Sequence, residues 1–213
     1  MIKWSANLGF LWTDRTLPDA IKAASQAGFD AVECHWPYEH DPLIITKTLS
    51  QTGLPMLVLN TKRGDMSKGE SQAAKQTLQA NLAYAAKRAE QAGKTILIEP
   101  LNHRDVPSYH LQSVEAAART IDAVGSDRVK IMFDFYHIQI LQGDLLNRFK
   151  AYLPYIGHVQ IAGVPQRAEP DRGEVNYPAL LPAIYEAGYD GYVGAEYKPV
   201  ADTDSGLGWR AAY

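Results

Sequence analysis

Four side chains with oxygen ligands stand where short apolar segments of this chain end. They are Glu99 in "TILIE", Asp134 in "KIMFD", Gln160 in "HVQIAG" and Glu196 in "YVGAE". Any one alone is more often a solvated loop residue or a helix cap, but three carboxylates brought together repel one another and are costly to bury. A divalent cation relieves both costs. Three carboxylates and one amide oxygen form a hard ligand set, which predicts Mg²⁺ or Mn²⁺ rather than zinc.

Histidines flank the same segment ends. His137 closes "DFYH", where it is placed to reach a substrate oxygen, and His103 lies in the loop after "TILIEP". His158 shares a strand face with Gln160, because the two are two positions apart. For His158, a supporting contact to the site and an ordinary core position both stay open. His35 ends the second predicted strand.

Apolar strands and helices alternate along the chain and must position these side chains. Thr16 as a cap, Pro18 early in the helix and Gly28 as a stop define the first helix. The predicted helices are 16–28, 42–53, 71–92, 112–125, 144–155 and 177–189; the predicted strands are 2–8, 29–36, 55–61, 94–102, 128–137, 156–163 and 191–199. A polar loop is expected over 62–70 and an irregular tail over 200–213.

Repeated strand–helix units of this kind predict an α/β fold with a parallel sheet covered by helices. A doubly wound nucleotide-binding fold requires a glycine-rich turn after the first strand, and the turn here offers Gly9 alone. A TIM-type (β/α) barrel is therefore favoured, with its chemistry at the carboxyl ends of the strands. We interpret residues 1–213 as a single barrel domain without internal linkers.

Composition excludes several classes of function. The chain of 213 residues is 46% hydrophobic and 21% charged, and its net charge of −3 gives no reason to expect nucleic acid or an anionic membrane surface as partner. No segment approaches the roughly 20 apolar residues of a membrane span, and the N-terminus does not resemble a signal peptide. Cys34 is the single cysteine, which favours a reducing cytoplasm.

Taken together, the motifs resemble the hydroxypyruvate isomerase family, within the xylose-isomerase-like sugar isomerases and epimerases. The matching stretches run nearly from end to end and include "SANL", "GFDAVE", "LNTKRGD", "IEPLNHRDVPSYHL", "FDFYH", "GHVQIAG", "EPDRGEVNY" and "EYKP" with "GLGW". The resemblance implies a (β/α)8 barrel that is an intramolecular oxidoreductase. It implies an isomerase with hydroxypyruvate and tartronate semialdehyde as the reacting pair and a metal-assisted enediolate between two glutamates.

The resemblance also assigns roles to residues. The implied metal ligands are Glu99, Asp134, Gln160 and Glu196. Glu99 and Glu196 are the implied catalytic pair, and His137 matches a histidine that contacts substrate. Arg167 is similar to an arginine that grips substrate in related epimerases. Further candidates for contacting a small 2-keto acid are His103, Lys198, Arg104 and Lys62.

The chain departs from this family in length. After "LNTKRGDMSKGE" a helix and a further strand are expected, yet one helix leads directly to "KTILIEPLN". The third helix and fourth strand of the barrel are therefore expected to be missing between residues 61 and 94. Two unpaired strand edges would result. Strained closure or a second copy of the chain would cover them, so a homo-oligomer stays open.

Alternatives to a hydroxypyruvate isomerase remain. A 2-oxo-tetronate isomerase performs the same carbonyl shift on a four-carbon substrate, and a ketose 3-epimerase shares the barrel. A non-catalytic small-molecule-binding barrel belongs to another class, motivated by the missing segment. A barrel endonuclease for damaged DNA is disfavoured, because six scattered histidines and a negative net charge suit neither a zinc cluster nor DNA.

Overall fold

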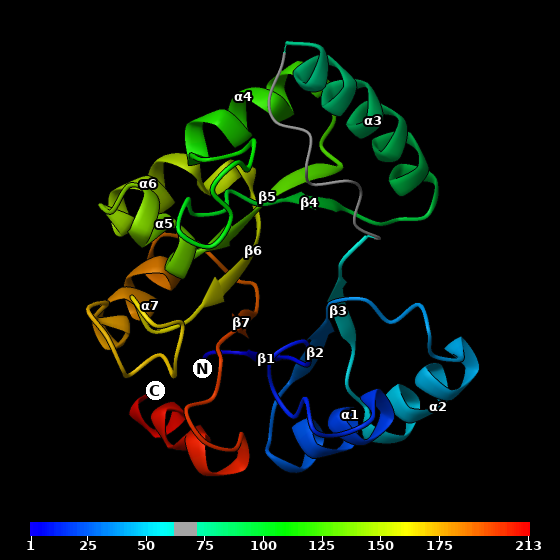
Figure 1. The fold of residues 1–213 in the computed structure, drawn as a ribbon, viewed down its shortest axis with the longest axis vertical. Helices are drawn as coiled ribbons and strands as arrows, with labels where there is room; N and C mark the ends of the chain where they lie inside the picture. Colours follow the sequence, from blue (N-terminus) through cyan, green and yellow to red (C-terminus); the bar gives the residue numbers. More distant parts are fainter. Residues whose placement is uncertain (62–71) are drawn as a thin grey trace. The chain divides into compact units, whose positions relative to one another are not determined.

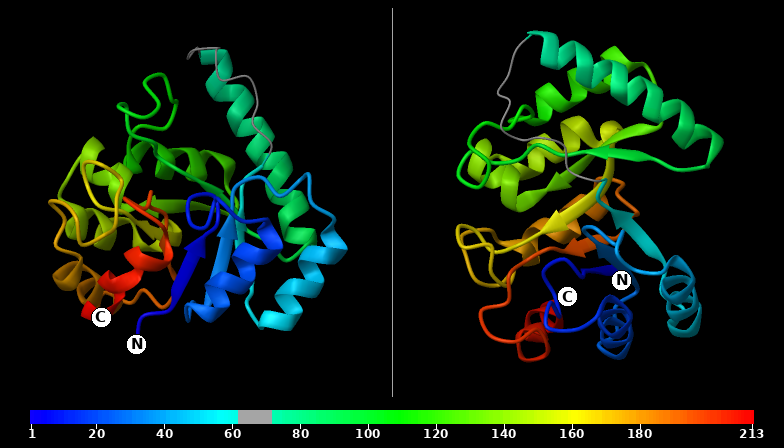
Figure 2. Two further views of the ribbon diagram at one scale, coloured as in Figure 1. Left: turned by 60° about the horizontal axis from the view of Figure 1, so that its bottom comes forward. Right: turned by 45° about the vertical axis from the view of Figure 1, so that its right-hand side comes forward.

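The computed structural model describes residues 1–61 and 72–213 (Figures 1 and 2). The chain divides into two compact units. Unit 1 comprises Met1–Gly64, Gln160–Leu181 and Asp190–Tyr213, and unit 2 comprises Asp65–Val159 and Pro182–Tyr189. Strand β6 (Ile156–Ile161) and helix α7 (Tyr177–Glu186) contribute residues to both. The predicted loop 62–70, with Lys62, lies outside the described residues. The prediction of a single domain stays a prediction.

The sheet of unit 1 is parallel, as the repeated strand–helix units predict. Its strands are β1 (Trp4–Asn7), β2 (Ala31–Cys34), β3 (Met56–Leu59), β7 (Val193–Ala195) and the end of β6. Strand β1 pairs with β2 and β7, and β2 pairs with β3. Ser5 is in register with Ala31 on one side and with Gly194 on the other. Because side chains alternate along a strand, Asn7, Glu33 and Glu196 face the same side of this sheet.

Helices α1 (Leu17–Gln26) and α2 (Pro42–Thr52) lie side by side next to the strands β1 and β2 (Figure 2). Both lie within two residues of the predicted helices 16–28 and 42–53. The Thr16 side chain accepts the Asp19 N–H at the start of α1, and Asp41 does the same for Leu43 at the start of α2. Helix α2 ends at Gly53, whose φ of 71° lies in the left-handed region.

The tail after residue 200 is not irregular, contrary to the sequence prediction. It forms the 3₁₀ helix η2 (Asp204–Ala212). Trp209 of η2 packs edge-on against Trp4, with ring centroids 4.9 Å apart, and donates from its indole nitrogen to the Tyr197 hydroxyl. Trp12 donates from its indole nitrogen to Asp204 over 2.7 Å. The tail is ordered because these contacts with residues distant in sequence hold it, and sequence spacing does not reveal them.

In unit 2, strand β4 (Ile96–Ile98) pairs in parallel with β5 (Val129–Asp134), and Gly157 of β6 lies against Lys130 of β5. The helices of this unit are α3 (Gln72–Gln91), α4 (Val114–Val124), α5 (Phe135–Leu141), α6 (Leu145–Tyr152) and the 3₁₀ turn η1 (Leu153–Tyr155). Phe133, Phe135 and Phe149 are fully buried, with ring centroids 5.0 to 5.8 Å apart. This aromatic cluster fixes β5 against α5 and α6.

Helix α5 corrects the predicted strand 128–137, which stops at Asp134. The Asp134 side chain accepts the Tyr136 N–H and caps a helix that begins at Phe135. The turn has a direct consequence for the site. In a strand, residues 134 and 137 would point to opposite faces, whereas three residues of helix bring His137 back beside Asp134.

The described residues form seven strands, as the sequence predicts, and two of them are outer strands. In the described part of unit 1, β3 pairs with β2 alone, and its Leu59 is 49% exposed. In the described part of unit 2, β4 pairs with β5 alone. One described helix, α3, connects β3 to β4, where a complete repeat would add a second helix and a strand. None of the helices described has the length and apolar character that crossing a bilayer requires.

Candidate active site

Glu196 follows strand β7 of unit 1, where three side chains contact its carboxylate. Asn7 donates from Nδ2 to Oε1 over 2.9 Å, and His35 Nε2 lies 3.2 Å from the same oxygen. Arg167 donates from Nη2 to Oε2 over 2.5 Å. The Glu196 side chain is only 10% exposed. These contacts fix the orientation of a nearly buried carboxylate, which suits a general base.

Asn7 and His35 have no role in the sequence-based prediction, although a signal for them exists. Both stand at the ends of strands β1 and β2, as Glu196 does after β7. The His35 ring lies directly against the backbone of Gly9, where an added Cβ would come within 2.2 Å of Nδ1. Gly9 is therefore required for this close approach and is unrelated to a nucleotide-binding turn.

Arg167 lies beside Glu196 and is already paired with it. Its guanidinium carbon is 4.9 Å from the centroid of the Phe10 ring, and the Lys198 ammonium lies 5.9 Å from the same centroid. The Lys198 side chain is exposed, and its backbone N–H donates to the Arg167 carbonyl over 2.7 Å. Two cations thus accompany Glu196 in unit 1, and a small anion would compete with Glu196 for Arg167.

Gln160, near the end of β6, contacts a carboxylate that the prediction does not include. Its Nε2 donates to Glu33 Oε2 over 2.8 Å, and both residues are almost completely buried. The Gln160 Oε1 atom is buried without a hydrogen-bond partner among the described residues. Gly194 of β7 lies against the pair: a Cβ there would be 2.5 Å from Glu33 Oε1 and 2.9 Å from Gln160 Cγ.

Replacing Gly194 by Ala is therefore expected to displace the Glu33–Gln160 hydrogen bond. We expect the free energy of unfolding to fall by about 1–3 kcal/mol, the usual cost of adding a methyl group to a packed site. Urea denaturation measures this loss. The matched control is Gly208→Ala, since a Cβ at Gly208 meets nothing within 4 Å. Unchanged stability in the Gly194 variant would contradict the packing described.

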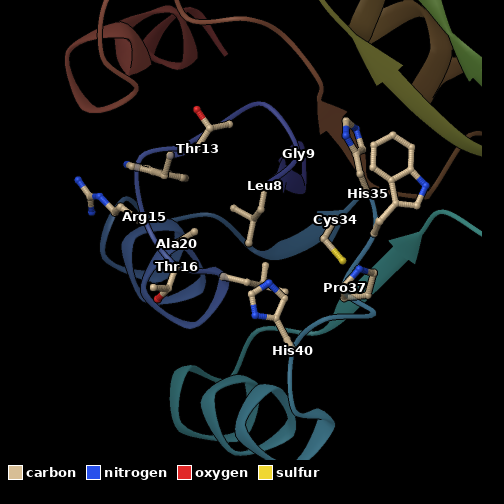
Figure 3. A pocket seen from close by; sticks show the side chains of 13 residues that line it. Leu8, Gly9, Thr13, Arg15, Thr16, Ala20, Cys34, His35, Pro37 and His40 are labelled. Carbon is tan, nitrogen blue, oxygen red and sulfur yellow. The ribbon is translucent and has the colours of Figure 1, made fainter. Parts of the chain in front are cut away.

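A pocket of about 300 Å³ opens in unit 1 beside His35 (Figure 3). It lies between the segment that follows β1 and the segment that follows β2. Its lining includes Leu8, Thr13, Thr16, Cys34, His35 and His40. His35 contributes both to this pocket and to the contacts of Glu196. Burial, and secondarily the charge of Glu33, raises the pKa of the Cys34 thiol to about 11.

Cys34 is accordingly expected to react slowly with iodoacetamide at pH 8. A pKa of about 11 lowers the thiolate fraction by about 100-fold relative to a thiol with a pKa near 9. Alkylation of the folded protein, followed by mass spectrometry, should be at least that much slower than alkylation in denaturant, and it should accelerate as the pH rises toward 11. Equal rates in the folded and denatured protein would show that the thiol is not shielded.

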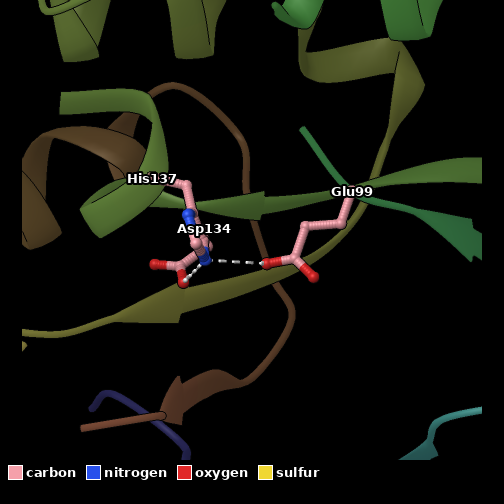
Figure 4. Close-up of side chains that lie close together, drawn as sticks. All are labelled: Glu99, Asp134 and His137. Carbon is pink, nitrogen blue, oxygen red and sulfur yellow. Dashed lines mark ion pairs between the residues drawn. The ribbon is translucent and has the colours of Figure 1, made fainter. Parts of the chain in front are cut away.

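In unit 2, Glu99, Asp134 and His137 form a second group (Figure 4). One possible ligand atom of each lies within 4.8 Å of those of the other two. His137 Nε2 is 3.8 Å from Glu99 Oε1 and 3.6 Å from Asp134 Oδ2. Asp134 is completely buried, and the Glu99 side chain is 27% exposed. This arrangement can hold a metal ion.

Asn102 determines which ring nitrogen of His137 carries the proton. The Asn102 backbone N–H donates to Nδ1 over 3.0 Å, and its side-chain Nδ2 lies 2.8 Å from the same atom. An Nδ1 that accepts a hydrogen bond has no proton, so the neutral ring carries it on Nε2. His137 therefore presents an N–H donor toward Glu99 and Asp134. That N–H suits a hydrogen bond to a substrate oxygen and leaves the carboxylates as the natural ligands of a cation.

The other predicted histidines occupy different environments. His103 is exposed in the loop that follows Asn102, and the Asn102 side chain accepts from the backbone of Arg104 and Asp105 there. His158 is buried in β6, and both of its alternatives stay open.

The fold and these side chains agree with the protein family that sequence comparison identifies. The model for the xylose isomerase-like TIM barrel family matches residues 63–213, and relatives more than 30% identical align with the whole chain. The chain belongs to the xylose isomerase-like TIM barrel family, which confirms the predicted fold class.

Individual proteins of known name are similar to this chain over its whole length. The chain is 35% identical to a 2-oxo-tetronate isomerase of Cupriavidus necator, covering 100% of this chain and 99% of that protein. It is 32% identical to the hydroxypyruvate isomerase of Escherichia coli, covering 100% of both. Among solved structures, it is similar to an AP endonuclease, family 2, from Brucella melitensis, with 31% identity, a TM-score of 0.94, and coverage of 100% of this chain and 99% of the other.

The alignment with the Cupriavidus protein is relevant to the helix and strand expected to be missing between residues 61 and 94. The alignment with the Cupriavidus protein extends over 257 positions, whereas this chain has 213 residues. That relative therefore contains residues with no counterpart here, as the predicted loss of a helix and a strand requires.

Proposed function

We propose that this protein is an isomerase that interconverts hydroxypyruvate and tartronate semialdehyde. The observation that carries the proposal is the pair of glutamates, each with side chains beside its carboxylate: Asn7, His35 and Arg167 contact Glu196, and His137 lies 3.8 Å from Glu99. The names of the curated relatives support the same chemistry. Both reactions in those names belong to one class, the shift of a carbonyl between adjacent carbons.

We further propose Glu99, Asp134, Gln160 and Glu196 as ligands of one divalent cation, Mg²⁺ or Mn²⁺. All four offer oxygen, the ligand that these ions prefer. Gln160 Oε1 supports this, because a buried amide oxygen without a hydrogen-bond partner is costly unless something binds it. When bound, such a cation polarises the substrate carbonyl and stabilises the negative charge of the enediolate.

The residues of the chain supply the proton transfers. One glutamate of the pair Glu99 and Glu196 takes the proton from C3 of hydroxypyruvate, the carbon that bears the hydroxyl. The other returns a proton to C2, so that each carboxylate acts in turn as base and acid. The proton of the C3 hydroxyl passes to the C2 oxygen, so that C3 becomes the aldehyde carbon and C2 carries the hydroxyl. His137 donates from Nε2 to a substrate oxygen and holds the hydroxyl and carbonyl in place. Arg167 binds the substrate carboxylate, with Lys198 and His103 as further contacts.

A 2-oxo-tetronate isomerase is the second candidate. The chain is 35% identical to a relative of that name and 35% identical to a putative hydroxypyruvate isomerase of Xenopus laevis, so the relatives support both candidates equally. The mechanism is unchanged, and the candidates differ only in the room needed for one more carbon. A cytoplasmic location and a homo-oligomeric state stay predictions.

Proton NMR of the products tests the proposal. Hydroxypyruvate and, separately, 2-oxo-tetronates are incubated with the protein, with and without a chelator. The expected result is the aldehyde from hydroxypyruvate, the 3-oxo acid from a 2-oxo-tetronate, or both, lost on chelation and restored by Mg²⁺ or Mn²⁺. If 2-keto acids bind in calorimetry but no product forms in the presence of metal, the protein is a binding module. Turnover that persists after complete chelation would contradict the role of the cation.

A further inference from the structure

We infer that Glu33 is a positioning residue that orients the amide of Gln160, so that its oxygen rather than its nitrogen is presented to the cation. The inference rests on the proposed function, because it concerns the proposed ligand Gln160. Glu33 is not among the proposed ligands. Its role is argued from the hydrogen bond between the two side chains and from the packing around them.

The hydrogen bond itself selects one orientation of the amide. Gln160 Nε2 lies 2.8 Å from Glu33 Oε2. An amide nitrogen only donates and a carboxylate only accepts, so this pairing is favourable. If the amide rotated by 180°, its oxygen would face the carboxylate oxygen at the same distance, and two acceptors would meet in a buried site. Glu33 is 0% exposed and Gln160 is 2% exposed, so water does not relieve such a contact.

The orientation determines what Gln160 offers to a ligand. With Nε2 held by Glu33, Oε1 is the remaining polar atom, and it is buried without a hydrogen-bond partner among the described residues. A cation binds an amide oxygen and is repelled by an amide NH₂ group. An unrestrained Gln would have to give up its rotational freedom on binding the ion, whereas Glu33 holds the binding orientation in advance.

The surrounding strands hold the pair in place. Glu33 stands on β2, and its backbone carbonyl accepts the Leu8 N–H over 2.8 Å. Strands β1 and β7 lie between β2 and the end of β6, and they contribute small residues in register, Ser5 and Gly194. The absence of a side chain at Gly194 leaves the space through which Glu33 and Gln160 meet. A larger residue there would separate them.

Mn²⁺ affinity of the purified protein, measured by electron paramagnetic resonance, tests the inference. Glu33→Gln is nearly isosteric, but its amide can donate to Gln160 Oε1 and so allows Gln160 to turn its NH₂ group toward the ion. We expect Mn²⁺ binding to weaken by about 10- to 100-fold, the usual effect of losing a group that orients a ligand. The melting temperature without metal is measured in parallel, and Glu39→Gln, an exposed carboxylate of the same unit, is the control.

A double variant that exchanges the residue types at positions 33 and 160 tests whether Glu33 orients Gln160 or only supports the fold. In Glu33→Gln with Gln160→Glu, the amide at 33 donates to the carboxylate at 160, which again presents an oxygen. We expect this double variant to recover the affinity that Glu33→Gln loses. If Glu33→Gln does not fold, the Mn²⁺ affinity of the double variant still tests the inference. A purely structural role would lower the melting temperature without this reciprocal recovery.

The results distinguish a failure of the proposed metal binding from a failure of the role inferred for Glu33. If the unmodified protein binds no Mn²⁺, the proposed metal function fails and the inference with it. If the unmodified protein and Glu33→Gln bind Mn²⁺ equally, the role of Glu33 is overturned and the proposed function stands. A loss in Glu33→Gln that the double variant does not restore would also overturn it.

Discussion

Glu196→Gln is expected to lower the turnover of hydroxypyruvate by about 10³-fold or more while the protein remains folded. General acid–base groups contribute about 10² to 10⁴-fold to rate, and Gln cannot accept a proton at this position. The amide keeps one acceptor oxygen, which can serve Asn7 or Arg167 but not both, because the two donate to different oxygens of Glu196. Turnover is followed by proton NMR, and folding by circular dichroism and thermal melting.

The control for this variant is Glu39→Gln, which removes an exposed carboxylate from the same unit. It should leave turnover unchanged within about twofold, since a surface charge of this kind contributes little. Full turnover by Glu196→Gln would remove this residue from the mechanism. Loss of turnover accompanied by unfolding would instead assign Glu196 a structural role.

Asp134→Asn is expected to weaken Mn²⁺ binding by about 100-fold and to reduce turnover with it. The substitution removes a charge from a fully buried group beside Glu99 and His137. It preserves helix α5, because Asn accepts the capping hydrogen bond from Tyr136 as well as Asp does. Calorimetric titration with Mn²⁺ measures the affinity, and the melting temperature should change little.

Asp127→Asn is the matched control, because Asp127 is an exposed carboxylate in the same unit. Its Mn²⁺ affinity should equal that of the unmodified protein. Unchanged affinity in Asp134→Asn would exclude this carboxylate as a ligand, and a collapse of the melting temperature would show that the negative charge serves the fold.

Much of the fold is predictable because its signals are local. The caps Thr16, Asp41 and Ser113 and the stop at Gly53 mark helix ends by contacts within four residues of the chain. Helix α5 is not predicted, because its local sequence does not decide between a strand and a helix. Phe135 suits a strand or a helix equally, and only the cap formed by Asp134 decides between them. The ordered tail depends on long-range contacts, such as that of Trp209 with Trp4.

The candidate site is predictable in part. The strand-end positions of Glu99, Asp134, Gln160 and Glu196 follow from the alternation of strands and helices. The residues that orient them do not, because each contact joins distant parts of the sequence: Glu33 meets Gln160 across 127 positions, and Asn7 meets Glu196 across 189. An acid inside a predicted buried strand, as in "AVEC", is the signal that points to Glu33 in retrospect.

Anomalous X-ray diffraction from crystals of the protein grown with Mn²⁺ tests the central claim most directly. The account predicts one manganese peak in direct contact with oxygen atoms of Glu99, Asp134, Gln160 and Glu196 together. A peak bound by Glu99, Asp134 and His137 without Gln160 and Glu196, or no peak at saturating Mn²⁺, would contradict it.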